Sequence, residues 1–301
     1  MTCEPQREYE QTSNGVLCVL VIELPCMTDA GTLGDAATAD AGDVCAACSL
    51  YLDGGTSCST LPTADGRGVI AYCEGEACCI GGRAPSGFLP RRVRAPNPTA
   101  ARLARMAQLE SASVDAFRAL HADLARLGAP RSLLIAIDAA ASDEVRHARM
   151  VTRAAERFGA RVPRASVPRP LAARSVEQLA SENAEEGCVR ETFGAAIATM
   201  QAERASDPRI RRMMRVIAND ELGHAALAWR IGRWFEARLD SEATVRVANT
   251  RLGALLRLRA ELSAEGPGDE VLGLPDARSL RAVLDAMGKA LETGDLTARA
   301  A

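Results

Sequence analysis

Aromatic residues make up only 3% of this 301-residue chain, although apolar residues reach 48%. The side chains available for a core are therefore mainly Ala, Leu, Val, Ile and Met, a composition that suits helices better than sheets. An excess of positive charge is also missing, because 36 basic residues face 39 acidic ones and the net charge is −3. Nucleic-acid-binding proteins usually carry a basic excess, so no nucleic-acid partner is expected.

Long apolar runs are missing as well. The longest, Val16 to Leu24, is interrupted by Glu23 and is far shorter than the ~18 residues that cross a bilayer. It does not resemble the apolar part of a secretory signal, because Glu4, Glu8 and Glu10 precede it where basic residues belong. The chain is therefore expected not to be transmembrane.

Charge and cysteine are distributed unevenly along the chain. Residues 1–90 contain 12 acidic residues and three arginines, a balance of −9, so the remainder carries +6. Residues 28–43 are a low-complexity stretch of Asp, Ala, Gly and Thr, which is typical of a flexible linker or a long loop. Nine of the ten cysteines also belong to this half: Cys3, Cys18, Cys26, Cys45, Cys48, Cys58, Cys73, Cys78 and Cys79.

The cysteines predict a separate N-terminal module over residues 1–95. Disulfides would staple a core too small to hold itself, and this interpretation favours an exported or cell-envelope protein. Cys45 and Cys48 have the spacing of Zn or Fe–S ligands, but Cys73, Cys78 and Cys79 do not repeat it, and this half has no histidine. A metal site and free thiols in a cytoplasmic protein remain the alternatives.

From about residue 96 the apolar residues follow a helical period, so the fold class is expected to be mainly α. Pro98 opens a first helix, Gly128 and Pro130 separate it from a second, and Pro208 opens a fourth. A long connection over 160–174 joins the two hairpins, which is the connectivity of a four-helix bundle over residues 96–240. The expected helices, including those of a C-terminal extension over 241–301, are 98–127, 131–158, 175–204, 208–239, 241–264 and 276–293.

Two of the three histidines occur in the same local pattern. His147 follows Asp143 and Glu144, and His224 follows Asp220 and Glu221, each at four and three residues. On a helix, residues i and i+3 lie about 60° apart around the axis and ~4.5 Å along it, so Glu and His can share one cation. Each pair lies on the apolar face, where an unpaired carboxylate would be costly to bury.

The first and third helices each place a glutamate on their inner face, Glu110 and Glu186. The separations Glu110 to Glu144 and Glu186 to Glu221 are nearly equal, at 34 and 35 residues. Each hairpin therefore brings its two glutamates to about the same depth. Four Glu and two His on four helices predict a site for two metal ions that prefer oxygen ligands. Surface ion pairing is the structural alternative.

Residues 98–239 resemble the ferritin-like superfamily of di-iron carboxylate proteins. Its motif, a Glu on helices one and three and ExxH on helices two and four, matches Glu110, Glu144/His147, Glu186 and Glu221/His224. The strings at 143–147 and 220–224 resemble those of bacterial di-iron monooxygenases. The resemblance implies that Asp143 and Asp220 orient the ligand histidines and that Arg146 pairs with one Asp.

The ligand on the third helix is the least constrained. Glu186 is preferred for its depth, with Glu182 as an outer ligand or a gate, and either Glu182 or Glu185 could replace it. Glu191 lies about 140° from Glu186 on an ideal helix. The cysteine on this helix, Cys188, is expected to serve packing, with a place near the metal as the alternative. His121 lies ~16 Å from Glu110 along the first helix, too far for the same centre.

The resemblance implies two iron ions that react with O2 or peroxide, with electrons from an unknown donor; the ligands also suit manganese. The first expectation is an oxidoreductase (oxygenase, oxidase or peroxidase). An iron-binding protein of the ferroxidase type without an organic substrate and a structural cell-envelope bundle are the alternatives. A radical-generating role is disfavoured, because the helical half has no tyrosine. The Cys-rich module suits a dimer better than a storage shell.

Overall fold

The computed structural model describes residues 6–12, 15–22, 57–62, 69–74, 83–85, 88, 90–91, 93–164, 173–262 and 268–292. The chain divides into two compact units, Met1–Cys78 and Cys79–Ala301. The helical unit therefore includes residues 79–95, which the sequence assigned to the N-terminal module, and also the C-terminal helices. Within the described ranges, no helix is both long enough and apolar enough to cross a membrane.

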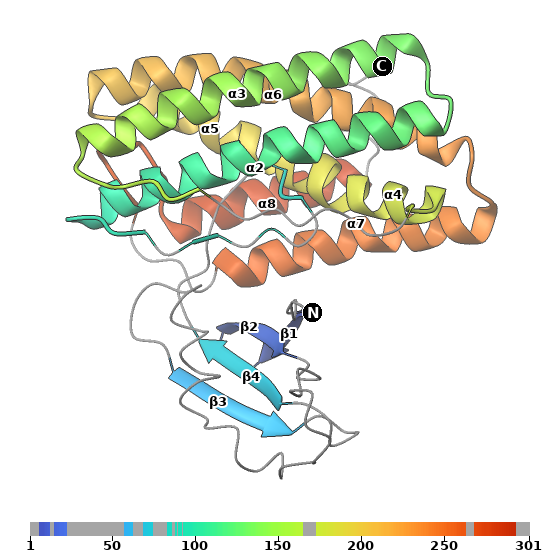
Figure 1. Cartoon of the computed structure of the whole chain (residues 1–301), viewed down its shortest axis with the longest axis horizontal. Helices are drawn as coiled ribbons and strands as arrows, with labels where there is room; N and C mark the ends of the chain where they lie inside the picture. Colours follow the sequence, from blue (N-terminus) through green and yellow to red (C-terminus); the bar gives the residue numbers. More distant parts are fainter. Residues whose placement is uncertain are drawn as a thin grey trace, which may run out of the picture. The chain divides into compact units, whose positions relative to one another are not determined.

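The N-terminal unit contains a four-stranded antiparallel sheet (Figure 1), which the sequence analysis did not anticipate. Its strands are β1 (Gln6–Thr12), β2 (Gly15–Ile22), β3 (Ser57–Pro62) and β4 (Val69–Glu74), in the order β1-β2-β4-β3. The register places Cys73 opposite Cys18 on one side and Cys58 on the other. The side chains of the nine N-terminal cysteines lie outside the described residues, so disulfides and a metal site there stay predictions.

The first two helices form a hairpin. Helix α2 (Pro98–Arg126) begins with Asn97, whose side chain accepts a hydrogen bond from the amide of Ala100 at 2.9 Å. It ends before Gly128, which adopts a φ of 73° that other residues rarely take. Helix α3 (Arg131–Arg157) follows directly and packs along α2. Both helices have the extent that their proline and glycine signals predict.

The third helical segment is continuous but not regular. It consists of α4 (Val176–Glu182), the π-helix η2 (Asn183–Glu191) and α5 (Thr192–Arg204). The sequence pattern predicted one uninterrupted α-helix over 175–204. The π-helix closes hydrogen bonds from i to i+5 instead of i+4 and so inserts an extra residue into the turn. Every side chain beyond it is consequently rotated relative to a regular helix.

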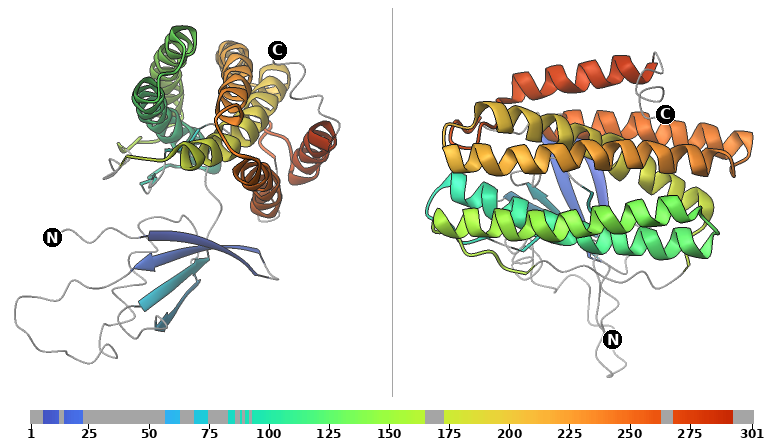
Figure 2. Two further views of the ribbon diagram at one scale, coloured as in Figure 1. Left: turned by 90° about the vertical axis from the view of Figure 1, so that its right-hand side faces the viewer. Right: turned by 90° about the horizontal axis from the view of Figure 1, so that it is seen from above.

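The remaining helices complete the unit. Helix α6 (Pro208–Glu236) packs along α5 and also contacts α3 and η2 (Figure 2). Helix α7 (Ser241–Glu261) packs against α4 and η2, and α8 (Ala277–Glu292) packs against α5 and α7. The two C-terminal helices thus cover the irregular third segment.

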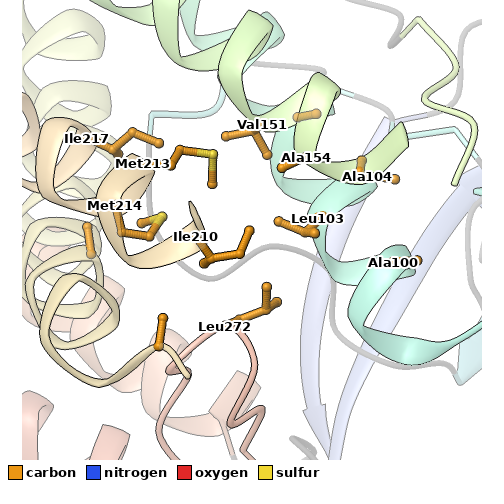
Figure 3. Packing of buried hydrophobic residues seen from close by; sticks show 14 of the residues in the cluster. Ala100, Leu103, Ala104, Val151, Ala154, Ile210, Met213, Met214, Ile217 and Leu272 are labelled. Carbon is orange, nitrogen blue, oxygen red and sulfur yellow. The ribbon is translucent and has the colours of Figure 1, made fainter. Parts of the chain in front are cut away.

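Two of the apolar clusters in the helical unit lie toward opposite ends of α2, α3 and α6. One contains Leu103, Val151, Ile210 and Met214, from α2, α3 and α6, together with Leu272 (Figure 3). The other contains Phe117 and Leu120 of α2, Ile137 of α3 and Phe235 of α6. Burying each such side chain contributes about 1.5–3 kcal/mol. On all three helices the stretch between the clusters carries the predicted Glu and His residues.

Candidate metal centre

Five of the six predicted ligands meet in the interior of the helical unit. Glu110 lies on α2, Glu144 and His147 on α3, and Glu221 and His224 on α6, and every one is at least 92% buried. The three-residue spacing of each Glu–His pair puts both side chains on the same face of its helix, as expected. Carboxylates and imidazoles from three helices therefore lie together in one buried region of the helical unit.

The first group consists of Glu110, Glu144, His147 and Glu221. One ligand atom from each lies within 4.8 Å of the others. Nδ1 of His147 is 3.3 Å from Glu221 Oε1, 3.5 Å from Glu110 Oε2 and 3.9 Å from Glu144 Oε2. Ligand atoms this close together can surround one divalent cation, which binds such atoms at about 2.0–2.2 Å.

The second group consists of Glu191, Glu221 and His224, with ligand atoms again within 4.8 Å of one another. Nδ1 of His224 is 3.1 Å from Glu144 Oε1 and 3.7 Å from Glu221 Oε2. Glu221 belongs to both groups, and Glu144 contacts both histidines through its two oxygens. The two groups therefore adjoin and share carboxylates, which is how a pair of metal ions can be held side by side.

On the third helical segment the structure brings Glu191, and not the predicted Glu186, into the cluster. The prediction extended 100° per residue through 183–191, which put Glu191 about 140° away from the inner face. The extra residue in η2 changes this phase by about 100°, and Glu191 turns inward with 1% of its surface exposed. The glycine inside this helical stretch, Gly187, is the signal in the sequence that points to an irregular turn.

The other glutamates of this segment bind elsewhere. Glu186 accepts a hydrogen bond from the amide of Ala84 at 3.0 Å. Glu182 pairs with Arg174 at the start of the segment, and Glu185 pairs with Arg257 of α7 at 2.7 Å. None of these three is a member of the two groups formed by the described residues.

Two aspartates lie beside the histidines, at the positions where the resemblance predicts carboxylates that orient them. Nε2 of His147 hydrogen-bonds to Asp220 Oδ2 at 2.9 Å, and Nε2 of His224 lies 3.5 Å from Asp143 Oδ2. Each aspartate serves the histidine of the other helix. Arg146 donates to both aspartates, at 2.8 Å and 2.7 Å. The hydrogen bond to Asp220 holds the ring of His147, and Nδ1 of both imidazoles faces the glutamates.

Cys188 and His121 lie outside both groups. The Cys188 thiol is buried 3.7 Å from the carbonyl oxygen of Ala228, and burial raises its pKa to about 11. His121 is 3.4 Å from Asp138 near the surface of the hairpin. Packing is the role that the structure gives to Cys188, in agreement with the first interpretation of the sequence.

The cluster leaves many buried polar atoms without a hydrogen-bond partner among the described residues. They are Nδ1 of both histidines, one oxygen each of Glu144 and Glu221, and both oxygens of Glu191, together with Nε2 of His224. Orphaned donor atoms of this kind are costly in a dry interior unless something binds them. A cluster of nitrogen and oxygen atoms converging on one volume fits divalent metal ions.

The burial and close contact of these side chains also change their pKa values. Burial, together with the neighbouring Glu110 and Glu221, raises the pKa of Glu144 well above its ordinary value. Burial lowers the pKa of each histidine, but the adjacent carboxylates outweigh it and bring His147 to about 11 and His224 to about 12. The metal-free cluster therefore holds protons, which bound cations would replace.

A residue that sequence reasoning missed also reaches this cluster. Arg83 belongs to a non-helical segment before α2, yet only 1% of its surface is exposed. Its Nε lies 4.0 Å from Glu191 Oε1, and its Nη2 donates to Asn183 Oδ1 at 2.8 Å. The surrounding sequence has no periodicity, so no local pattern indicates that this arginine is buried.

Comparison with known proteins gives no relative: no protein-family model, no curated protein and no solved structure matches the chain. The candidate metal site therefore rests on the geometry of these residues alone.

Proposed function

We propose that residues 96–240 form a ferritin-like four-helix bundle that holds two iron ions and reacts with O2 or peroxide as an oxidoreductase. The observation that carries this proposal is the pair of adjoining groups, Glu110/Glu144/His147/Glu221 and Glu191/Glu221/His224, which share Glu221. A single structural ion pair does not need four buried carboxylates and two buried imidazoles. Two cations would neutralise this charge and bind the orphaned atoms.

The protein's own residues supply the binding and the orientation. Asp220 hydrogen-bonds to the His147 imidazole, whose Nδ1 is directed inward, and Asp143 lies 3.5 Å from Nε2 of His224. Arg146 fixes both aspartates from outside. Apolar clusters on either side keep bulk water from the carboxylates. When bound, two iron ions would each supply one electron to O2 or peroxide. Manganese is the alternative metal.

The first experiment measures metal. Protein purified from iron-supplemented cells is expected to contain about two iron ions per chain, measured by elemental analysis, with visible and Mössbauer spectra of a coupled pair. Glu144→Ala is expected to lose most of this metal. Glu156→Ala, an exposed change on the same helix, is the matched control and should keep it. Equal metal content in the two variants would refute the proposed site.

The second experiment separates the proposed oxidoreductase from an iron-oxidising protein. The iron-loaded protein is supplied with O2 and candidate reductants or organic substrates, and O2 consumption is followed. Faster consumption with a substrate, lost in Glu144→Ala, supports the oxidoreductase. If Fe(II) is oxidised but no organic substrate accelerates O2 use, the ferroxidase-type function replaces it, and size-exclusion chromatography then tests for a shell.

A further inference from the structure

The segment that carries Arg83 is fixed to the helical unit at several points. The carbonyl oxygen of Arg83 accepts a hydrogen bond from Ser113 Oγ at 2.8 Å. Further along, the side chain of Gln108 accepts from the amide of Arg91 at 2.7 Å and donates to its carbonyl at 2.9 Å. Phe88 is buried against α2 between these points. These contacts bring the backbone of Arg83 to the surface of the bundle, with its side chain directed inward.

The third helical segment leaves room for this side chain. A Cβ atom on Gly187 would lie 2.3 Å from Nη2 of Arg83 and 2.7 Å from Oδ1 of Asn183. Glycine at this turn of η2 is therefore what allows the guanidinium to enter. The group also lies over the ring of Phe117, 5.4 Å from its centroid, and Phe117 in turn contacts His224. The side chain of Arg83 thus fills the space between Gly187, Asn183 and Phe117.

The guanidinium is an unusual neighbour for a cation site. Its ion pair is with Glu191, which belongs only to the second group, and its Nε and Nη1 lack hydrogen-bond partners among the described residues. The first group contains three glutamates and has no arginine ion pair in the described part of the chain. A fixed positive charge in a buried, low-dielectric site repels a metal ion nearby far more strongly than it would in water.

We propose that Arg83 makes the two metal positions unequal: its buried charge weakens cation binding at Glu191, Glu221 and His224 relative to the group around His147. This inference rests on the proposed function, because it requires a two-metal site. It assigns to Arg83 a positioning and charge-balancing role, and the first ion is expected to enter the group that contains Glu110.

The test titrates metal-free, full-length protein with Co²⁺ and follows visible absorption and calorimetry. The wild-type protein is expected to bind two Co²⁺ ions with separated affinities, and Glu191→Gln should remove the weaker step. Arg83→Met is expected to tighten the weaker step by about tenfold or more, because a neighbouring buried positive charge is gone. Arg83→Gln, which is neutral but keeps a polar side chain, serves as a second neutral variant.

Two controls separate charge from shape. Arg83→Lys keeps the charge and should leave the two affinities as in the wild type. Arg257→Met removes an arginine that pairs with Glu185 of the same π-helix but is 40% exposed, so it should change neither step. Equal affinities in the wild type, no tightening in the neutral variants, or Arg83→Lys behaving like Arg83→Met would each overturn the inference. Absence of any Co²⁺ binding that depends on Glu144 would instead refute the proposed function.

Discussion

Asp220 is the residue on which the orientation of His147 depends most directly. It lies on α6, while the imidazole lies on α3, and their atoms are 2.9 Å apart. We predict that Asp220→Asn weakens metal binding about 10–100-fold, because the amide is a weaker acceptor and the histidine is then less well oriented. Titration with Mn²⁺ or Co²⁺ measures this. Asp138→Asn, an exposed change near His121, should leave binding unchanged; an equal effect of both would contradict the prediction.

Gly187 offers a second prediction at the level of a single residue. Gly187→Ala should lower the free energy of unfolding by about 1–3 kcal/mol, because the added methyl group overlaps Arg83, Asn183 and Ala228. Gly288→Ala in α8 is the matched control. Apart from the backbone of its own helix, no atom of the described residues lies within 4 Å of its Cβ position, so it should stabilise by about 0.5–1 kcal/mol. Urea unfolding followed by circular dichroism measures both free energies of unfolding. If both substitutions stabilised the protein, the packing of Arg83 against Gly187 would be contradicted.

The individual residues also show what a sequence reveals about a site. Glu144, His147, Glu221 and His224 were predictable because a regular helix converts three-residue spacing directly into proximity. Glu191 was not, since its direction depends on an extra residue in a turn that the periodicity assumed to be regular. Arg83 reaches the cluster through tertiary contacts, and these leave no local pattern.

At the scale of elements, α6 begins with a strong cap. Oδ1 of Asp207 accepts hydrogen bonds from the amides of Arg209 and Ile210 at 2.7 Å and 3.0 Å, and Oδ2 accepts from Arg157 at 3.0 Å. Partial burial raises the pKa of Asp207, but these donors outweigh it, and the pKa falls below its ordinary value of 3.8. The ionised carboxylate therefore joins the start of α6 to the end of α3.

We predict that Asp207→Ala destabilises the protein by about 1 kcal/mol at neutral pH. Because the folded-state pKa is lowered, this contribution is fully present above the unfolded pKa and disappears as the pH falls through the folded pKa. The difference between variant and wild type should therefore shrink at about pH 3, measured by urea unfolding at both pH values. Asp115→Ala, an exposed change within α2, is the control. A difference that grows on acidification would contradict the prediction.

Helix limits were the most predictable part of the fold. Pro98, Gly128, Gly159 and Pro208 act locally on the backbone, so they mark a boundary wherever tertiary structure places the helix. The strands of the N-terminal unit were not predicted, because the cysteines indicated a disulfide-linked or metal-binding module and the few aromatic residues favoured helices. The run Val16–Ile22, with its β-branched residues and the preceding Asn14 and Gly15, is a hairpin signal that could have revealed them.

At the scale of the whole molecule, the proposed metal centre should contribute to stability. Three carboxylates, those of Glu144, Glu191 and Glu221, and both histidines have buried atoms without a hydrogen-bond partner among the described residues. They lie between two apolar clusters. A ligand that binds only the folded state stabilises it by about 2.7 kcal/mol when its free concentration is about 100 times Kd. Mn²⁺ is therefore expected to raise the unfolding midpoint of the helical unit in proportion to the logarithm of its concentration.

Far-ultraviolet circular dichroism measures this midpoint, because the signal comes mainly from the helical unit. The chelated protein should unfold at the lowest temperature. His224→Ala should respond less to Mn²⁺ than the wild type, while Glu156→Ala should respond equally. If the chelated and the metal-supplemented wild type unfolded at the same temperature, metal binding would not stabilise the helical unit.

The contacts of residues 83, 84 and 91 with the helical unit have a practical consequence for anyone who shortens the chain. A fragment cut just ahead of Asn97 would retain all the glutamates and histidines of the centre, and it would look complete by helix content. It would nevertheless lack the buried guanidinium of Arg83 beside Glu191 and the amide of Ala84 that donates a hydrogen bond to Glu186. Occupancies determined on such a truncated fragment would describe a centre with a different charge from the one in the intact protein.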